Sequence, residues 1–121
     1  MGEVTVNFIA FDEALDACLM VLVEEAWSEP VEVHLRELQD RLYGCLDAAL
    51  DGQLAAQFPA SLGKPVIIRI DCYDLDRGEI DGFIGRFAEG VATLPEYSTE
   101  ASPYVSEIRF EVNHDTLAPP H

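Results

Sequence analysis

The densest group of side chains that could bind a metal ion lies in the segment DCYDLDRGEID, residues 71–81. Its carboxylates belong to Asp71, Asp74, Asp76, Glu79 and Asp81. A calcium-binding loop needs a glycine at its sixth position and a glutamate at its twelfth, but counted from Asp74 the glycine comes at the fifth and Gly85 occupies the twelfth. The spacing predicts no metal site. It favours helix capping instead, because carboxylates at a strand-to-helix turn interact favourably with the helix dipole.

Nucleophilic catalysis requires a serine or cysteine beside a base and an orienting carboxylate. The histidines are His34, on the polar side of a predicted helix, His114, near the end of a predicted strand, and the terminal His121. Each of the 3 cysteines lies within an apolar run, where burial raises a thiol pKa and makes the group inert. The chain contains no phosphate-binding or dinucleotide-binding glycine motif. We therefore expect no catalytic residues, no cofactor and no enzyme activity.

Trp27 is the residue best suited to anchor a protein partner. It lies between Glu24, Glu25 and Glu29, and an aromatic side chain surrounded by acids suits a partner that offers arginine or lysine. The alternative is that Trp27 caps the core end of the helix that follows it.

That helix is the element around which the other segments are arranged. Between Ser28 and Gly52, apolar residues recur at steps of three and four and form one stripe along a helix. Ser28 is a good N-cap, Pro30 is tolerated in a first turn, and Gly52 ends the helix. The opposite face is charged. A one-sided helix of this kind must pack against another element, most economically a sheet.

Alternating or continuous apolar runs predict strands at residues 3–11, 17–24, 66–73 and 104–112, and helical spacing predicts a second long helix at residues 77–94. The order ββαβαβ indicates an α+β fold, a single two-layer domain spanning residues 1–121 with a four-stranded mixed sheet and two helices packed on one face. Residues 114–121 are expected to be a frayed tail. In the second long helix, Gly82 and Gly85 suggest close approach to a neighbouring element.

The outer face of this sheet is expected to be polar over its last two strands but apolar over its first two. Side chains alternate between the two faces of a strand, and either assignment of the first two strands leaves several apolar side chains on the outer face. The candidates are Ile9, Phe11, Leu19, Met20, Val21 and Leu22. Such a patch marks a binding or self-association surface, unless the C-terminal tail covers it.

Charge sets limits on the partner. The chain has 23 acidic and 7 basic residues, a formal net charge of −16, and no lysine or arginine among residues 1–34. This charge repels nucleic acid and anionic membranes and speeds encounter with a cationic protein, although an acidic surface also simply keeps a protein soluble. The odd number of core-like cysteines, and the lack of a signal peptide or membrane span, predict a soluble cytoplasmic protein.

Residues 26–70 resemble an uncharacterised family of small acidic bacterial proteins, a domain of unknown function. The shared pattern is a tryptophan, a helix of the form H-L-x-x-L-Q-x-x-L-x-x-x-L, a glycine, an aromatic-proline step and G-x-x-V-x-I-x-I. Here these are Trp27, His34, Leu35, Leu38, Gln39, Leu42, Leu46, Gly52, Phe58, Pro59, Gly63, Val66, Ile68 and Ile70. The resemblance implies an accessory protein encoded near a secreted toxin, and therefore an immunity role.

We expect a non-catalytic interaction protein, an immunity protein that neutralises a cognate bacterial toxin through an acidic surface. The expected partner is a cationic toxin domain. The predicted partner-binding residues are Asp12, Glu13, Asp16, Glu24, Glu25, Trp27, Glu29 and Glu32. The alternative is a homodimeric structural or regulatory protein that pairs through its apolar sheet face. A hydrolase or metal-dependent enzyme that uses the carboxylates of residues 71–81 is a third hypothesis.

Overall fold

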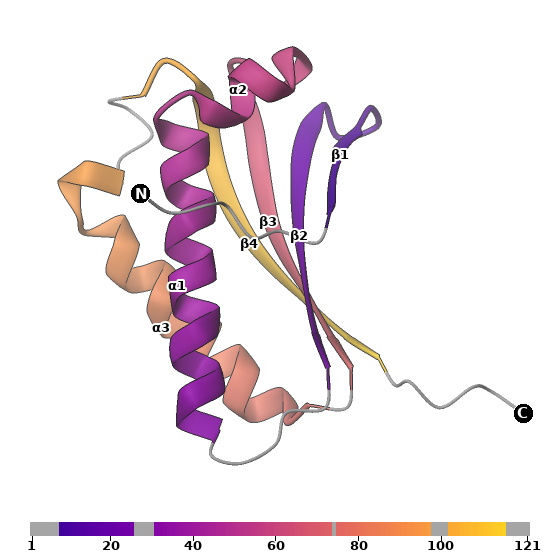
Figure 1. Ribbon diagram of the computed structural model, residues 1–121, viewed down its shortest axis with the longest axis vertical. Helices are drawn as coiled ribbons and strands as arrows, with labels where there is room; N and C mark the ends of the chain where they lie inside the picture. Colours follow the sequence, from indigo (N-terminus) through magenta and orange to yellow (C-terminus); the bar gives the residue numbers. More distant parts are fainter. Residues whose placement is uncertain (1–7, 26–30, 74, 98–101, 116–121) are drawn as a thin grey trace, which may run out of the picture.

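The computed structural model describes residues 8–25, 31–73, 75–97 and 102–115. Four strands form one sheet in the order β1-β2-β3-β4 (Figure 1). These strands are β1 (Phe8–Asp12), β2 (Ala17–Glu25), β3 (Lys64–Tyr73) and β4 (Val105–Asp115). β1 is antiparallel to β2, whereas β2, β3 and β4 are parallel. The predicted four-stranded mixed sheet is confirmed.

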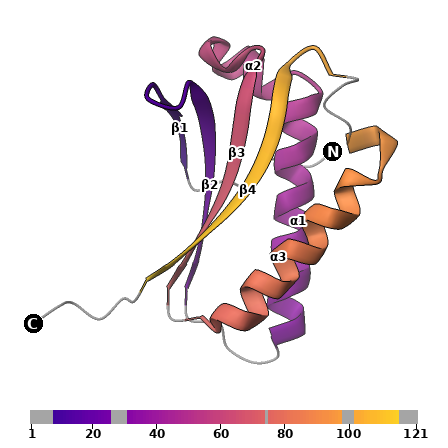
Figure 2. The same ribbon diagram turned by 180° about the vertical axis from the view of Figure 1, so that it is seen from behind.

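Two long helices, α1 (Val31–Leu50) and α3 (Arg77–Ala92), cover one face of the sheet (Figures 1 and 2). α1 connects β2 to β3 and α3 connects β3 to β4, so both belong to crossovers between neighbouring parallel strands. Successive crossovers of the same hand that advance in one direction put their helices on the same side. The two-layer arrangement follows directly from this order.

α1 buries the stripe that its sequence predicts. Its buried residues are Leu38, Leu42, Cys45, Leu46, Ala48 and Ala49. The chain leaves the helix at Gly52, which has a φ of 94° that favours glycine, and a Cβ atom there would lie 2.8 Å from the ring of Tyr104. The predicted helix end at Gly52 is therefore confirmed, whereas the predicted caps Ser28 and Pro30 lie outside the described residues.

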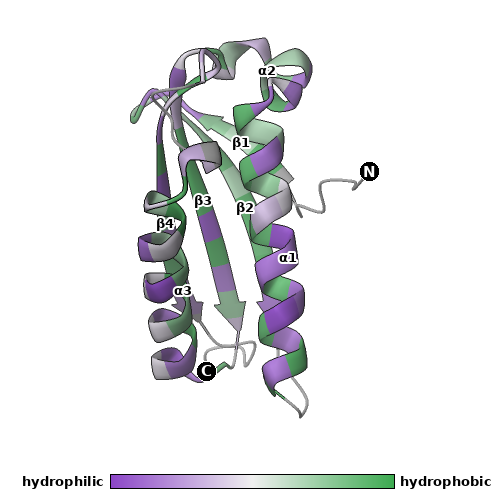
Figure 3. Cartoon of the chain, turned by 90° about the vertical axis from the view of Figure 1, so that its left-hand side faces the viewer, coloured by the Kyte–Doolittle hydropathy of each residue, from purple (hydrophilic) through white to green (hydrophobic). Residues whose placement is uncertain are grey.

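The helix-facing side of the sheet holds the main core. It contains Cys18, Met20 and Leu22 from β2, and Val66, Ile68, Ile70 and Cys72 from β3. In Figure 3, β2 and β3 run between the two helices; β2 is coloured mostly as hydrophobic, whereas hydrophilic bands alternate with hydrophobic ones along β3. Ile108, Phe110 and Val112 of β4 pack against the same cluster, as their alternation predicts.

The apolar outer face agrees with the prediction in part. Ile9, Phe11, Met20 and Leu22 belong to the helix-side core, so they are not on the outer face. Strand alternation places two of the predicted residues, Leu19 and Val21, on the outer face, together with Val23 of β2 and Ile67 of β3. Val21 and Ile67 are each 0% exposed. The outer face is thus already covered over its centre.

Two shorter details differ from the prediction. β4 extends to Asp115, so His114 and Asp115 belong to the sheet and not to a frayed tail. The expected close approach at Gly82 and Gly85 is not found among the described residues: within 4 Å of an added Cβ they place no atom at Gly85 and, at Gly82, the flexible end of Arg86. Between α1 and β3, the chain forms α2 (Gln53–Gln57) and the 3-10 turn η1 (Pro59–Ser61), and a second 3-10 turn, η2 (Pro95–Tyr97), follows α3.

Candidate binding surface

The predicted partner-binding acids do not form one surface. Asp12, Glu13 and Asp16 lie at the turn between β1 and β2, while Glu24 and Glu25 end β2. Asp16 and Glu24 are separated by a strand segment of about 26 Å, taking roughly 3.3 Å per residue. Figure 1 shows these positions at opposite ends of the sheet.

The second group contains Glu24, Glu25 and Glu32. Glu24 forms an ion pair with Arg41 of α1, and its side chain is only 13% exposed. Glu32 is exposed in the first turn of α1. The backbone of Glu25 belongs to β2, but its side chain, together with Trp27 and Glu29, lies outside the part of the chain that the structure describes. Glu24 is therefore mainly a structural partner of α1.

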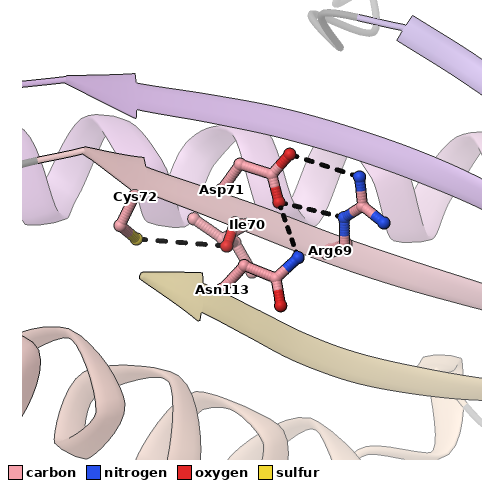
Figure 4. A network of polar contacts seen from close by, with 5 residues as sticks. All are labelled: Arg69, Ile70, Asp71, Cys72 and Asn113. Carbon is pink, nitrogen blue, oxygen red and sulfur yellow. Dashed lines mark hydrogen bonds and ion pairs between the residues drawn. The ribbon is translucent and has the colours of Figure 1, made fainter. Parts of the chain in front are cut away.

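Other acids at this carboxyl end of the sheet also have partners within the fold. Asp71 accepts hydrogen bonds from Arg69 Nε at 2.9 Å and from Asn113 Nδ2 at 3.2 Å (Figure 4). Asp76 caps α3, because its Oδ1 accepts from the backbone N–H of Glu79 at 2.8 Å. The predicted capping role is confirmed for Asp76, and Asp74 lies outside the described residues. A search of those residues for three or more grouped metal-ligating side chains finds none.

A cysteine, a histidine and a carboxylate come together at this end in a way that the sequence spacing conceals. Cys72 and His114 are register partners on β3 and β4, and His114 Nε2 lies 2.8 Å from Asp81 Oδ1 of α3. Cys72 is only 1% exposed, and its thiol donates to the carbonyl of Ile70. Burial, reinforced by Glu24, Asp81 and Asp71, raises the pKa of the Cys72 thiol to about 12. The sulfur is thus protonated at neutral pH and poorly suited to act as a nucleophile.

The opposite end of the molecule exposes apolar side chains beside acids. Leu15 is 54% exposed, Phe58 40% and Leu62 55%, and they are three of the four large hydrophobic residues found exposed among the described residues. Leu15 belongs to the β1–β2 turn, and the other two residues flank η1. Figures 1 and 2 both show these segments at the same end of the molecule. We call Asp12, Glu13, Leu15, Asp16, Phe58 and Leu62 the amino-edge surface.

Two polar contacts organise this surface. Asp12 Oδ1 accepts from the backbone N–H of Leu15 at 3.1 Å, which fixes the turn. Lys64 Nζ, at the start of β3, lies 2.7 Å from Asp16 Oδ2. This ion pair is exposed and contributes little stability, but it ties the turn to the strand that follows Leu62. Glu13 is exposed in the same turn.

A small pocket adjoins the amino-edge surface. Its volume is about 200 Å³, and its lining residues are Ile9, Ala10, Phe11, Cys18, Gln57, Phe58, Pro59, Ala60 and Ser61. Ser61 is 1% exposed, and no described group forms a hydrogen bond with its hydroxyl. Burial raises the pKa of the Cys18 thiol, so this wall is neutral as well. Sequence reasoning missed this pocket, although the aromatic-proline step Phe58–Pro59 marked part of its wall.

A second hollow of about 320 Å³ lies between α1 and α3. Its walls include Tyr43, Phe83 and Phe87. The Tyr43 and Phe87 rings meet edge-on with centroids 5.0 Å apart, and Phe87 meets Phe110 of β4 at 5.7 Å. These contacts join both helices to the sheet, so the aromatic residues have a structural role.

Comparison with known proteins gives no match: no family model, curated protein or solved structure is similar to this chain. The resemblance to a family of small acidic bacterial proteins therefore stays a prediction. Among the described helices, none has the length and apolar character needed to cross a membrane.

Proposed function

We propose that this chain is a non-catalytic interaction protein that binds a cationic protein and neutralises it, as an immunity protein does with a toxin domain. The observation that carries the proposal is the amino-edge surface, where exposed Leu15, Phe58 and Leu62 lie at the same end as Asp12, Glu13 and Asp16. Apolar side chains at the centre of an interface supply affinity, and surrounding charges speed association and select the partner.

The whole-chain charge supports the same class of partner. A net charge of −16 attracts a cationic protein over distances comparable to the Debye length, about 10 Å at 0.1 M salt. Toxins that act on nucleic acid are commonly basic, and carboxylates can take the place of phosphates in their clefts. The 3 buried free cysteines fit a reducing compartment, so the proposal places the protein in the cytoplasm.

The surface proposed here keeps only part of the predicted set. It retains Asp12, Glu13 and Asp16, and it replaces Trp27 as the apolar centre with Leu15, Phe58 and Leu62. Glu24 is left out because it is paired with Arg41 and its side chain is only 13% exposed, whereas the Asp16 side chain, although paired with Lys64, remains 64% exposed. Glu32 lies at the other end of the molecule and would serve only as a source of long-range attraction.

The alternative, a homodimer formed through the apolar sheet face, draws less support from the geometry. Val21 and Ile67, at the centre of that face, are already 0% exposed within a single chain. Among the described side chains of β2 on that face, Leu19 and Val23 retain intermediate exposure. A dimer that uses this face would bury little additional apolar area.

The test is capture of the partner from a lysate of the source organism, with the purified chain as bait and washes of rising salt. We expect one cationic protein in equal amount. Glu13→Lys should reduce its recovery, whereas Glu89→Lys, the same charge change on an exposed position of α3, should not. Equal recovery with both variants would disprove the amino-edge surface.

Neutralisation needs a separate measurement. The captured protein is expressed in a bacterial host with and without this chain, and growth is followed. We expect growth arrest that is relieved by the wild-type chain and by Glu89→Lys but less by Glu13→Lys. A captured protein that does not impair growth would rule out the immunity role.

A further inference from the structure

The pocket beside the amino-edge surface has the composition of a ligand site. Ile9, Phe11, Phe58 and Pro59 supply apolar walls, and among the described lining residues Cys18 alone is ionisable. The raised pKa of that thiol keeps it neutral. A charged ligand would find no counter-ion on these walls, so the pocket suits a neutral and mostly apolar molecule.

Its size selects a single ring. A dry apolar cavity of about 150 Å³ is known to hold benzene, so about 200 Å³ leaves room for one ring with a small substituent. Two phenylalanines in the wall favour an aromatic ring, because aromatic pairs gain from edge-to-face and offset contacts.

The second observation is the buried hydroxyl of Ser61. The backbone of this residue is held by η1, where its N–H donates to the carbonyl of Phe58 at 2.8 Å. Its side chain, in contrast, has no hydrogen-bond partner among the described residues. An unpaired buried hydroxyl is costly, whereas a serine hydroxyl can both donate and accept. A ligand that carries one hydroxyl group would therefore recover a hydrogen bond here that an apolar ligand could not.

We propose that this pocket binds a phenol-like ring, with the ring against Phe11, Phe58 and Pro59 and its hydroxyl group hydrogen-bonded to Ser61. The ring can belong to a free small molecule or to a tyrosine of the partner protein. The site itself does not depend on the proposed neutralising function, and only its assignment to a partner tyrosine rests on that proposal.

The test uses the purified full chain with p-cresol and toluene, which differ by one hydroxyl group. Amide chemical shifts are followed by NMR during titration with each compound. We expect p-cresol to shift the signals of the pocket residues. Ser61→Ala should raise the Kd for p-cresol about 3- to 10-fold, which is the effect of one net hydrogen bond. The Kd for toluene should change by less than about 2-fold.

Ser106→Ala is the matched control, because Ser106 is an exposed serine on β4 away from the pocket. It should leave both affinities unchanged. Phe58→Ala should weaken the binding of both p-cresol and toluene, because it removes an aromatic side chain from the pocket wall. The proposal is overturned if p-cresol shifts no pocket signals, or if Ser61→Ala and Ser106→Ala have equal effects on p-cresol.

A final arm separates the two sources of the ring. Excess p-cresol is added to the chain with its captured partner bound. Displacement of the partner assigns the ring to a partner tyrosine, and retention of the partner assigns it to a free small molecule.

Discussion

At the scale of single residues, burial decides which titratable groups remain reactive. The thiols of Cys45 and Cys72 are 0% and 1% exposed, and burial raises the pKa of each from its ordinary range to about 12. In the unfolded chain both would titrate near their ordinary value. The two sulfurs therefore stay protonated in the folded state over a range in which the unfolded chain has lost both protons.

This difference predicts alkaline destabilisation. The folded pKa values lie above the unfolded ones, so the contribution of the thiols is constant below about pH 9 and declines as pH rises toward 12. Each thiol should lower the free energy of unfolding by about 1.4 kcal/mol per pH unit within that range. Urea unfolding at several pH values measures the slope. Cys45→Ala should remove about half of the decline in the free energy of unfolding with pH that the two thiols cause. If this decline is unchanged in Cys45→Ala, the pKa of the Cys45 thiol is the same in the folded and unfolded chain.

At the scale of elements, the effect of a glycine on stability depends on whether its backbone conformation and neighbours require the absence of a side chain. Gly85 lies in the middle of α3, and no described residue comes within 4 Å of an added Cβ, so no packing contact with these residues requires a glycine there. Gly52 is the opposite case, because its φ is +94° and the Tyr104 ring lies 2.8 Å from the Cβ position. The same change to alanine should therefore have opposite signs at these two positions.

We expect Gly85→Ala to stabilise the protein by about 1 kcal/mol, the difference between glycine and alanine in a helix interior. Gly52→Ala should destabilise it by more than about 1 kcal/mol, because alanine resists positive φ and collides with Tyr104. Urea unfolding of both variants measures the two changes. A destabilising Gly85→Ala would mean that α3 contacts something beyond the described residues.

At the scale of the whole molecule, charge and burial together oppose self-association. Two copies that each carry a formal charge of −16 repel one another, and the centre of the outer sheet face is already covered. We expect light scattering at micromolar concentration and low salt to give a mass of 13.4 kDa. Twice that mass, abolished by Leu19→Lys on the outer face, would favour the homodimer alternative. Met20→Lys and Leu22→Lys are unsuitable tests, since both side chains are in the core.

The sequence by itself determined the elements and their order. The stripe of α1, its end at Gly52, the strands and the Asp76 cap depend on local spacing and local hydrogen bonds, which the chain carries within a few residues. The parallel crossovers then left little choice about the side on which the helices pack.

Only the tertiary structure decided which residues share a surface. Acids close in the sequence, Asp16 and Glu24, are held apart by the length of β2, while Leu15 and Phe58 lie at the same end of the molecule because of strand register and the path of α2 and η1. The pairing of Cys72 with His114, and the burial of Ser61 and Val21, likewise depend on contacts between distant segments. Such contacts arise from packing and register, which the periodicity of a single segment does not encode.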